Sequence, residues 1–200
     1  NPAIIFKDCD YELMMETLVQ SSFANQGQIC LCSSRILVEK QIYKKFKKDF
    51  IDAVSALRIG DPINNSIQYG AISSAEQLKK IDHYVELAKK ENGTILLGGN
   101  PIKLSGRCQD GWFYEPTIIE GLNNSSRVNQ EEIFGPVVTL QSFNSEKEAV
   151  ENANCTDYGL SATVWTTDQK KGNRIINKID AGVIWLNCWM IRDLRTPFGG

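Results

Sequence analysis

The sequence has a single histidine, no strong excess of either charge and no long apolar run, and these shortages exclude several classes of protein. Lys and Arg number 22 against 24 Asp and Glu, for a formal charge of −2, so no basic field attracts nucleic-acid phosphates. No apolar stretch approaches the roughly 20 residues that span a bilayer, and the first residues show no secretory signal pattern. We expect no nucleic-acid partner, no membrane association and a cytoplasmic location.

The six cysteines do not have the spacing of a metal site or of a disulfide framework. The nearest two, Cys30 and Cys32, form only a Cys-x-Cys pair. A chain of 200 residues with 42% hydrophobic content buries a core without covalent crosslinks. We expect reduced cysteines and no bound metal.

Hydrophobic periodicity predicts strands that alternate with helices along the whole chain. The expected strands are 2–7, 35–39, 94–97, 137–143, 161–165 and 182–187. The expected helices follow Asp10 and then cover 40–57, 74–90, 145–152 and 168–179. Such alternation is typical of an α/β fold with a mostly parallel open sheet flanked by helices. No linker or repeat divides residues 1–200, so we expect one domain.

Cys30 is the candidate nucleophile. It follows Gly27 and precedes small and β-branched residues, so it is expected at a bend, where backbone amides favour the reactive thiolate. A free cysteine is more often a small buried hydrophobe, and the residue alone leaves both interpretations open. A cysteine hydrolase would need a base, and His83, the only histidine, falls on a predicted helix among charged neighbours.

Four segments of the chain form an ordered set of motifs. Ser22–Cys30, followed by Ser34-Arg35, resembles the active-site cysteine signature of the aldehyde dehydrogenase family. Gln130–Val137 resembles its nicotinamide-ribose motif, and Pro197–Gly200 its active-site rim. Asn1-Pro2 matches the end of the family's Gly-Gly-Lys-x-Pro segment. The ordered set is far more specific than a lone Gly-Gln-x-Cys.

The resemblance implies a mechanism and a cofactor. Cys30 would attack an aldehyde to give a thiohemiacetal and then a thioester, with hydride passing to NAD or NADP. The Cys30 backbone N–H would hold the oxyanion together with an asparagine that the chain lacks, and the water-activating glutamate would precede Asn1. Glu132 would accept hydrogen bonds from the ribose hydroxyls and Phe134 would pack beside the ribose and nicotinamide. Glu131 has the weaker claim.

The C-terminal part resembles most closely the family branch that acts on 2-aminomuconate and 2-hydroxymuconate semialdehydes. The resemblance rests on Gly182–Trp189 and on Ile191–Arg195. Those substrates carry a carboxylate, and a guanidinium is suited to hold one at two points. We expect Arg192 in that role, with Arg195 second, and Trp189 and Phe198 as further substrate-binding residues.

The resemblance also implies that the 200 residues are the catalytic domain of a longer enzyme, truncated at both ends and separated from its cofactor-binding domain. We expect the chain alone neither to bind the cofactor tightly nor to turn over aldehyde, and the parent enzyme to be a homo-oligomer. Two alternatives stay open, an inert structural or interaction module and a cysteine hydrolase or esterase. Arg35 is expected to form a structural ion pair.

Overall fold

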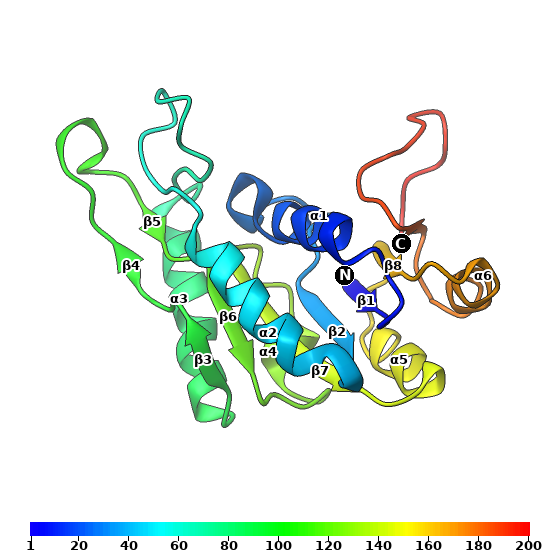
Figure 1. Ribbon diagram of the computed structural model, residues 1–200. Helices are drawn as coiled ribbons and strands as arrows, with labels where there is room; N and C mark the ends of the chain where they lie inside the picture. Colours follow the sequence, from blue (N-terminus) through cyan, green and yellow to red (C-terminus); the bar gives the residue numbers. More distant parts are fainter.

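A seven-stranded sheet forms the middle layer of the protein, which a computed structural model describes over residues 1–200 (Figure 1). All neighbouring strands are parallel except β3 and β6, which are antiparallel, so the expected mostly parallel sheet is confirmed. In spatial order the strands are β3 (Thr94–Leu97), β6 (Thr117–Glu120), β7 (Val137–Phe143), β2 (Arg35–Glu39), β1 (Pro2–Ile5), β8 (Ser161–Trp165) and β9 (Val183–Leu186).

Six α-helices connect these strands. Four of them begin after a residue whose side chain accepts a hydrogen bond from the first helical turn, as Ser74 does from the N–H of Gln77. None has both the length and the apolar content of a membrane span. The helices are α1 (Tyr11–Phe23), α2 (Lys40–Ser55), α3 (Ala75–Lys90), α4 (Arg127–Gln130), α5 (Glu146–Ala153) and α6 (Gln169–Ile176).

Short elements complete the chain between the main ones. Two 3-10 turns, Ala24–Gly27 and Gly106–Cys108, follow α1 and β4 respectively. A small antiparallel pair, β4 (Pro101–Ile102) and β5 (Phe113–Tyr114), lies outside the main sheet. Periodicity did not predict this pair, because two residues are too few to show a pattern.

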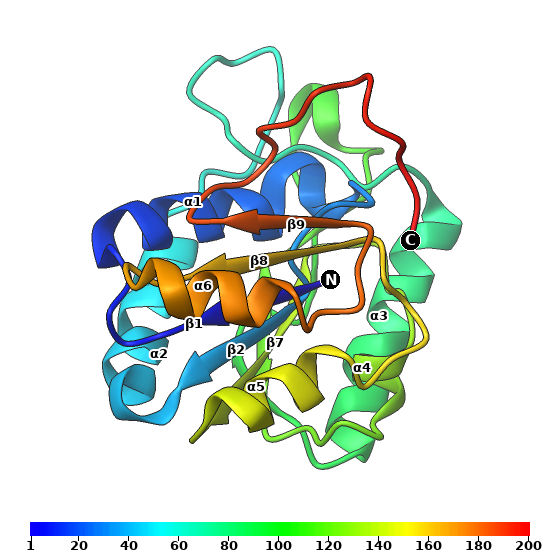
Figure 2. The same cartoon turned by 90° about the vertical axis from the view of Figure 1, so that its right-hand side faces the viewer.

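Side chains that alternate along the strands divide the core between the two faces of the sheet. Ala3 and Ile5 of β1 belong to the cluster beneath α1 and α2, whereas Ile4 packs with residues of α5 and α6. Figure 2 shows α1 and α2 on the left and α3 with α4 on the right. Helices therefore cover both faces, as a parallel sheet requires.

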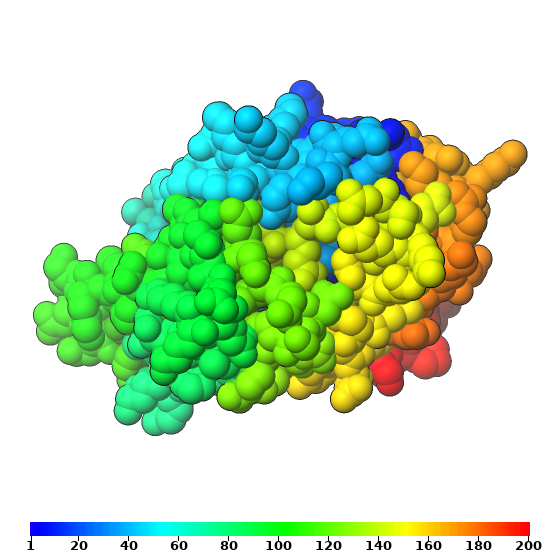
Figure 3. All heavy atoms as spheres, turned by 90° about the horizontal axis from the view of Figure 1, so that it is seen from below, coloured from blue at the N-terminus to red at the C-terminus, as the bar shows by residue number.

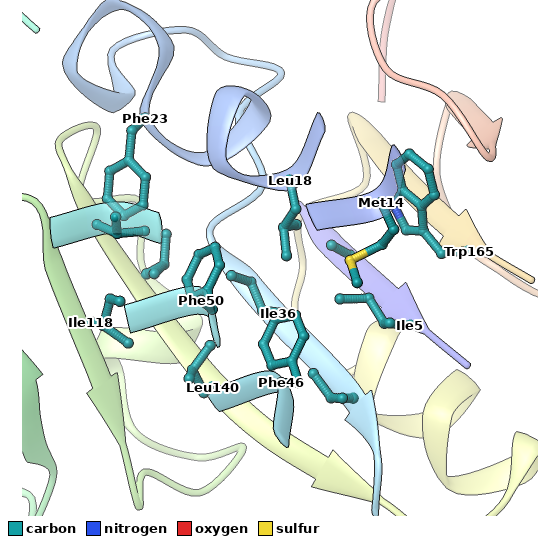
Figure 4. Close-up of a cluster of buried hydrophobic side chains, with 14 of the residues drawn as sticks. Ile5, Met14, Leu18, Phe23, Ile36, Phe46, Phe50, Ile118, Leu140 and Trp165 are labelled. Carbon is teal, nitrogen blue, oxygen red and sulfur yellow. The ribbon is translucent and has the colours of Figure 1, made fainter. Parts of the chain in front are cut away.

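The cluster beneath α1 and α2 is rich in aromatic side chains (Figure 4). The ring centroids of Phe46 and Phe50 are 5.4 Å apart and those of Phe23 and Phe50 are 6.3 Å apart, both pairs stacked. Phe46 and Phe50 are fully buried. They fix α2 against the sheet and against the end of α1, the helix that leads into the turn of Cys30.

In a parallel sheet, the loops that precede the strands all lie at the amino ends of the strands, and the loops that follow them lie at the carboxyl ends. Figure 3 shows the underside of the molecule, toward which β2 and β6 point in Figure 1. The amino ends of the strands, on the opposite side, carry the segments before β1, β2, β7 and β8. Three of the four sequence motifs lie at the starts of β1, β2 and β7, and the fourth is C-terminal. The topology therefore brings these three motifs together.

We predict that Phe50→Ala lowers the free energy of unfolding by about 3–5 kcal/mol, because it leaves a cavity in a fully packed aromatic cluster. Ile63→Ala is the control, since Ile63 is 71% exposed, and it should change stability by no more than about 0.5 kcal/mol. Urea unfolding measures both. Equal effects of the two substitutions would contradict the assigned core.

Candidate active site

A cavity of about 310 Å³ opens at the amino ends of the parallel strands. Its lining includes the predicted nucleophile Cys30 and both predicted cofactor-binding residues, Glu132 and Phe134. The remaining lining includes Asn1, Ser22, Gly27, Cys32, Arg35, Glu131, Gly135, Thr139, Thr156, Tyr158 and Leu160. Residues more than 100 positions apart in the sequence therefore line one cavity.

An unusual backbone conformation turns the chain from α1 toward Cys30. Asn25, Gln26 and Gly27 follow one another with φ of 49°, 59° and 68°, all left-handed. A β-carbon on Gly27 would stand 2.2 Å from the carbonyl oxygen of Gly135. Only glycine permits both this conformation and this approach, so the turn of Cys30 packs backbone to backbone on the loop of Glu132 and Phe134.

The two glutamines of the turn anchor it to the segment before α3. Gln26 donates to the carbonyl of Ala71 (2.7 Å) and accepts from the N–H of Gly70 (3.3 Å). Gln28 donates to the hydroxyl of Ser73 (2.8 Å) and accepts from its N–H (3.0 Å). Each amide thus uses a donor and an acceptor. These bonds hold the left-handed turn in place against its conformational cost.

Cys30 presents its thiol differently from the neighbouring Cys32. Among the six free cysteines Cys30 alone is exposed. Cys32 is buried, its thiol points to the carbonyl of Ala24, and burial raises its pKa to about 11. The backbone N–H of Cys30 donates to no protein acceptor. Cys30 therefore combines an accessible thiol with a free N–H beside it, while Cys32 is a packing residue.

The loop before β7 holds Phe134 in a left-handed conformation with φ of 57°. Gln77 of α3 fixes this loop by donating to the carbonyls of Ile133 and Phe134, both at 2.8 Å. Such a conformation is rare for an aromatic residue, and it is held here by these bonds.

The two glutamates of this loop have different surroundings. Glu131 accepts hydrogen bonds from Arg127 and from the hydroxyl of Tyr84, and the Arg127 guanidinium, followed by Tyr84, lowers the pKa of Glu131 to about 2. Glu132 is exposed and accepts no hydrogen bond from the protein. Glu132 is thus the carboxylate that is free to bind a ligand, and Glu131 ties the loop to α3 and α4.

The predicted substrate residues lie in the C-terminal segment, outside the lining of the cavity. Arg192 and Phe198 are exposed, with the guanidinium 5.4 Å from the centre of the Phe198 ring. Arg195 is paired with Asp193. Trp189 is half-buried, and its indole N–H donates to the carbonyl of Leu31 at 3.0 Å. This bond joins the segment to the residue that follows Cys30.

Arg35 does not form the expected ion pair. It is 5% exposed and donates to the carbonyls of Asn152 (2.7 Å) and Ala153 (2.8 Å) and to the sulfur of Cys155 (3.3 Å). The two carbonyls end α5, where carbonyl groups lack helical partners. The expectation was wrong because these backbone acceptors, rather than a carboxylate, surround the guanidinium.

His83 lies apart from Cys30. It is exposed on α3, its ring stands edge-on to that of Tyr84, and it does not line the cavity. A cysteine hydrolase would need this imidazole within hydrogen-bond reach of the thiol. The geometry offers no such pair.

Comparison with known proteins agrees with this arrangement. The model of the aldehyde dehydrogenase family matches residues 1–200. The chain belongs to the aldehyde dehydrogenase family. The resemblance seen in the four motifs is thereby confirmed over the whole chain.

Individual relatives in the family point to a smaller group. The chain is 46% identical to a 2-aminomuconic semialdehyde dehydrogenase of Danio rerio and 38% identical to a 2-hydroxymuconic semialdehyde dehydrogenase of Pseudomonas putida. Both matches cover 100% of this chain, but only 42% and 41% of the relatives. The chain thus spans about two fifths of the length of these relatives.

A solved structure shows the same fold. Betaine aldehyde dehydrogenase from Staphylococcus aureus, determined in complex with NAD+, superimposes with a TM-score of 0.94 at 39% identity. The match covers 100% of this chain and 39% of that one. The strand order and helix layers described above are therefore those of an aldehyde dehydrogenase.

We predict that Gly27→Ala lowers the free energy of unfolding by about 2–5 kcal/mol, from a left-handed alanine and a steric overlap with Gly135. Gly106→Ala is the matched control, because Gly106 has a φ of 64° and no atom within 4 Å of an added β-carbon. Its cost should stay near about 1–2 kcal/mol. Urea unfolding compares the two, and equal losses would contradict the close contact between the loops.

Proposed function

We propose that these residues form the catalytic part of an NAD(P)-dependent aldehyde dehydrogenase that oxidises an aldehyde to the acid. The observation that carries the proposal is the exposed thiol of Cys30 in one cavity with Glu132 and Phe134. The turn of Cys30 and the loop of Glu132 and Phe134 are in backbone contact, so these two segments lie side by side. Membership in the family and the names of the relatives support the same reaction.

Cys30 forms the covalent bond in this proposal. Its thiolate attacks the aldehyde carbon, a carbon–sulfur bond forms, and the carbonyl electron pair moves to oxygen. The N–H of Cys30 has no acceptor in the chain, and in the proposal it donates to that oxyanion. Collapse of the thiohemiacetal expels hydride from carbon and leaves a thioester on Cys30, which water cleaves to the acid and the thiol.

The residues beside Cys30 suit a nicotinamide cofactor. When bound, NAD or NADP supplies the hydride acceptor. The unpaired carboxylate of Glu132 can accept hydrogen bonds from both ribose hydroxyls, and the Phe134 ring offers an apolar surface next to it. Glu131 is already bonded to Arg127 and Tyr84 and does not compete for this role.

A base for the thioester hydrolysis is assigned outside these 200 residues. Glu131 and Glu132 are the only carboxylates that line the cavity, and both have other roles. The second oxyanion donor and most of the cofactor site are assigned there as well, on the resemblance to the family. We further propose that the 200 residues alone bind NAD weakly and turn over no aldehyde, and, as a separate proposal, that the full-length enzyme assembles as a homo-oligomer.

The proposed substrate is a semialdehyde that also carries a carboxylate. The two relatives named above act, by their names, on 2-aminomuconic and 2-hydroxymuconic semialdehydes. Arg192 is exposed and has no carboxylate partner in the chain, whereas Arg195 is bound to Asp193. Arg192 is therefore the guanidinium available for the substrate carboxylate, with Trp189 and Phe198 beside it on the same segment.

We predict that Cys30→Ser reduces NADH formation to background in the full-length protein that carries these residues, because a serine hydroxyl without a base is a poor nucleophile. Cys108→Ser, at a half-buried cysteine outside the cavity, should leave the rate unchanged. Absorbance at 340 nm follows the reaction. A Cys30→Ser protein with the full rate would refute the proposed function and favour an inert role for this part of the chain.

We predict that Arg192→Met raises KM about 10- to 100-fold for a semialdehyde that bears a carboxylate, since a charge-assisted pair contributes about 1.5–3 kcal/mol. The KM for an uncharged aldehyde of similar size should change little. Arg195→Met is the control, because its partner is Asp193. If both substrates lose affinity equally, or if Arg195→Met has the larger effect, the assignment of Arg192 is wrong.

A further inference from the structure

The three consecutive carbonyls of the Cys30 turn are all held by side chains from distant parts of the chain. The amide nitrogen of Asn1 donates to the carbonyl of Cys30 at 2.7 Å and to that of Cys32 at 2.9 Å. The indole of Trp189 donates to the carbonyl between them, on Leu31, at 3.0 Å. The turn has one backbone hydrogen bond of its own, from the N–H of Cys32 to the carbonyl of Ile29 at 2.9 Å. The side chains of Asn1 and Trp189 add the bonds that hold its three carbonyls.

Asn1 uses the full hydrogen-bonding geometry of a carboxamide. Both hydrogens of its nitrogen are directed at the turn, and its side-chain oxygen accepts from the N–H of Ser161 at 3.1 Å. Its backbone carbonyl accepts from the N–H groups of Ser34 (3.1 Å) and Arg35 (3.3 Å). Asn1 thereby connects the starts of β1, β2 and β8. Aspartate has the same shape but no donor, and serine has only one.

These bonds constrain the orientation of the Cys30 peptide. A peptide unit is planar, so fixing the carbonyls of Cys30 and Cys32 leaves little freedom of rotation at Leu31, which lies between them, and at Cys30 itself. Both the direction of the Cβ–Sγ bond and that of the free N–H of Cys30 depend on this orientation. Because Cys30 is exposed, surrounding side chains do not fix the thiol by packing.

We propose that Asn1 is a positioning residue for the nucleophile. It holds the turn so that the thiol of Cys30 can attack the carbonyl carbon of the substrate while the backbone N–H of Cys30 donates to the oxygen of the same carbonyl. Trp189 is the second anchor of the same turn and couples it to the C-terminal segment. The inference rests on the proposed function, since it assigns to Asn1 an effect on the step in which the carbon–sulfur bond forms.

The test uses the full-length protein that carries these residues, with saturating NAD and aldehyde. The variants are Asn1→Asp, which preserves shape and removes both donors, and Asn1→Ala. The control is Asn65→Asp, at an exposed asparagine whose side chain makes no hydrogen bond. Stopped-flow absorbance gives the rate constant of NADH formation in the first turnover, and quenching of protein fluorescence gives the Kd for NAD. Melting temperatures are recorded so that each variant is assayed well below its own.

Both Asn1 variants are expected to slow the first turnover about 10- to 100-fold, the effect of a small misplacement of a reacting group. The Kd for NAD should remain within about twofold, and Asn65→Asp should match the wild type. A variant with a lower melting temperature but an unchanged first-turnover rate would overturn the inference, because Asn1 would then only stabilise the fold. If Asn1→Asp does not fold, Asn1→Ser carries the same test with an intermediate effect, since it keeps one donor.

The same experiment separates this inference from the proposed function. If the wild-type protein forms no NADH with any aldehyde, the proposed function fails and the inference fails with it. If the wild type forms NADH and the Asn1 variants do so at the same rate, the proposed function stands and only the role of Asn1 is refuted.

Discussion

The contact of two backbones at Gly27 and Gly135 is the constraint on which the rest of the site depends. A β-carbon at Gly27 would overlap the carbonyl of Gly135, so the turn of Cys30 and the loop of Glu132 touch with no side chain between them. The glutamines of the turn and Gln77 of α3 hold the two sides of this contact. The contact fixes the relative position of the two backbone segments that carry Cys30 and Glu132, and rigid support of this kind is what a binding or catalytic site requires.

The sheet topology decides where this contact lies. Ligands in open α/β sheets usually bind beyond the carboxyl ends of the strands. Here the residues before β1, β2, β7 and β8 gather at the amino ends, and each carries part of the cavity. The central strands β1, β2, β7 and β8 are largely buried, whereas the edge strands β3 and β9 are mostly half-buried. The strands form the frame, and the residues that line the cavity lie mainly on the short segments that enter it.

Much of the frame follows from the sequence because its signals are local. The periodic stripe of α3 and the cap at Ser74, or the β-branched run of β7, lie within a few residues and predict the observed elements closely. The grouping of Cys30, Glu132 and Phe134 required knowledge of the family, since no local pattern pairs positions 100 residues apart. The partners of Arg35 and the bonds of Asn1 and Trp189 were not foreseen. They are hydrogen bonds from side chains to backbone across the fold, and they have no signature in periodicity or spacing.

In the proposed reaction, Cys30 carries the acyl group of the oxidised aldehyde beside the loop of Glu132 and Phe134. Trapping that acyl group is the sharpest test of the proposal. The full-length protein is mixed with NAD and aldehyde, quenched in acid within the first turnovers, and digested for peptide mass spectrometry. We expect an acyl group on Cys30, with Cys32 of the same peptide unmodified and no acyl group when NAD is omitted. An acyl group on another cysteine, or none while NADH accumulates, would contradict it.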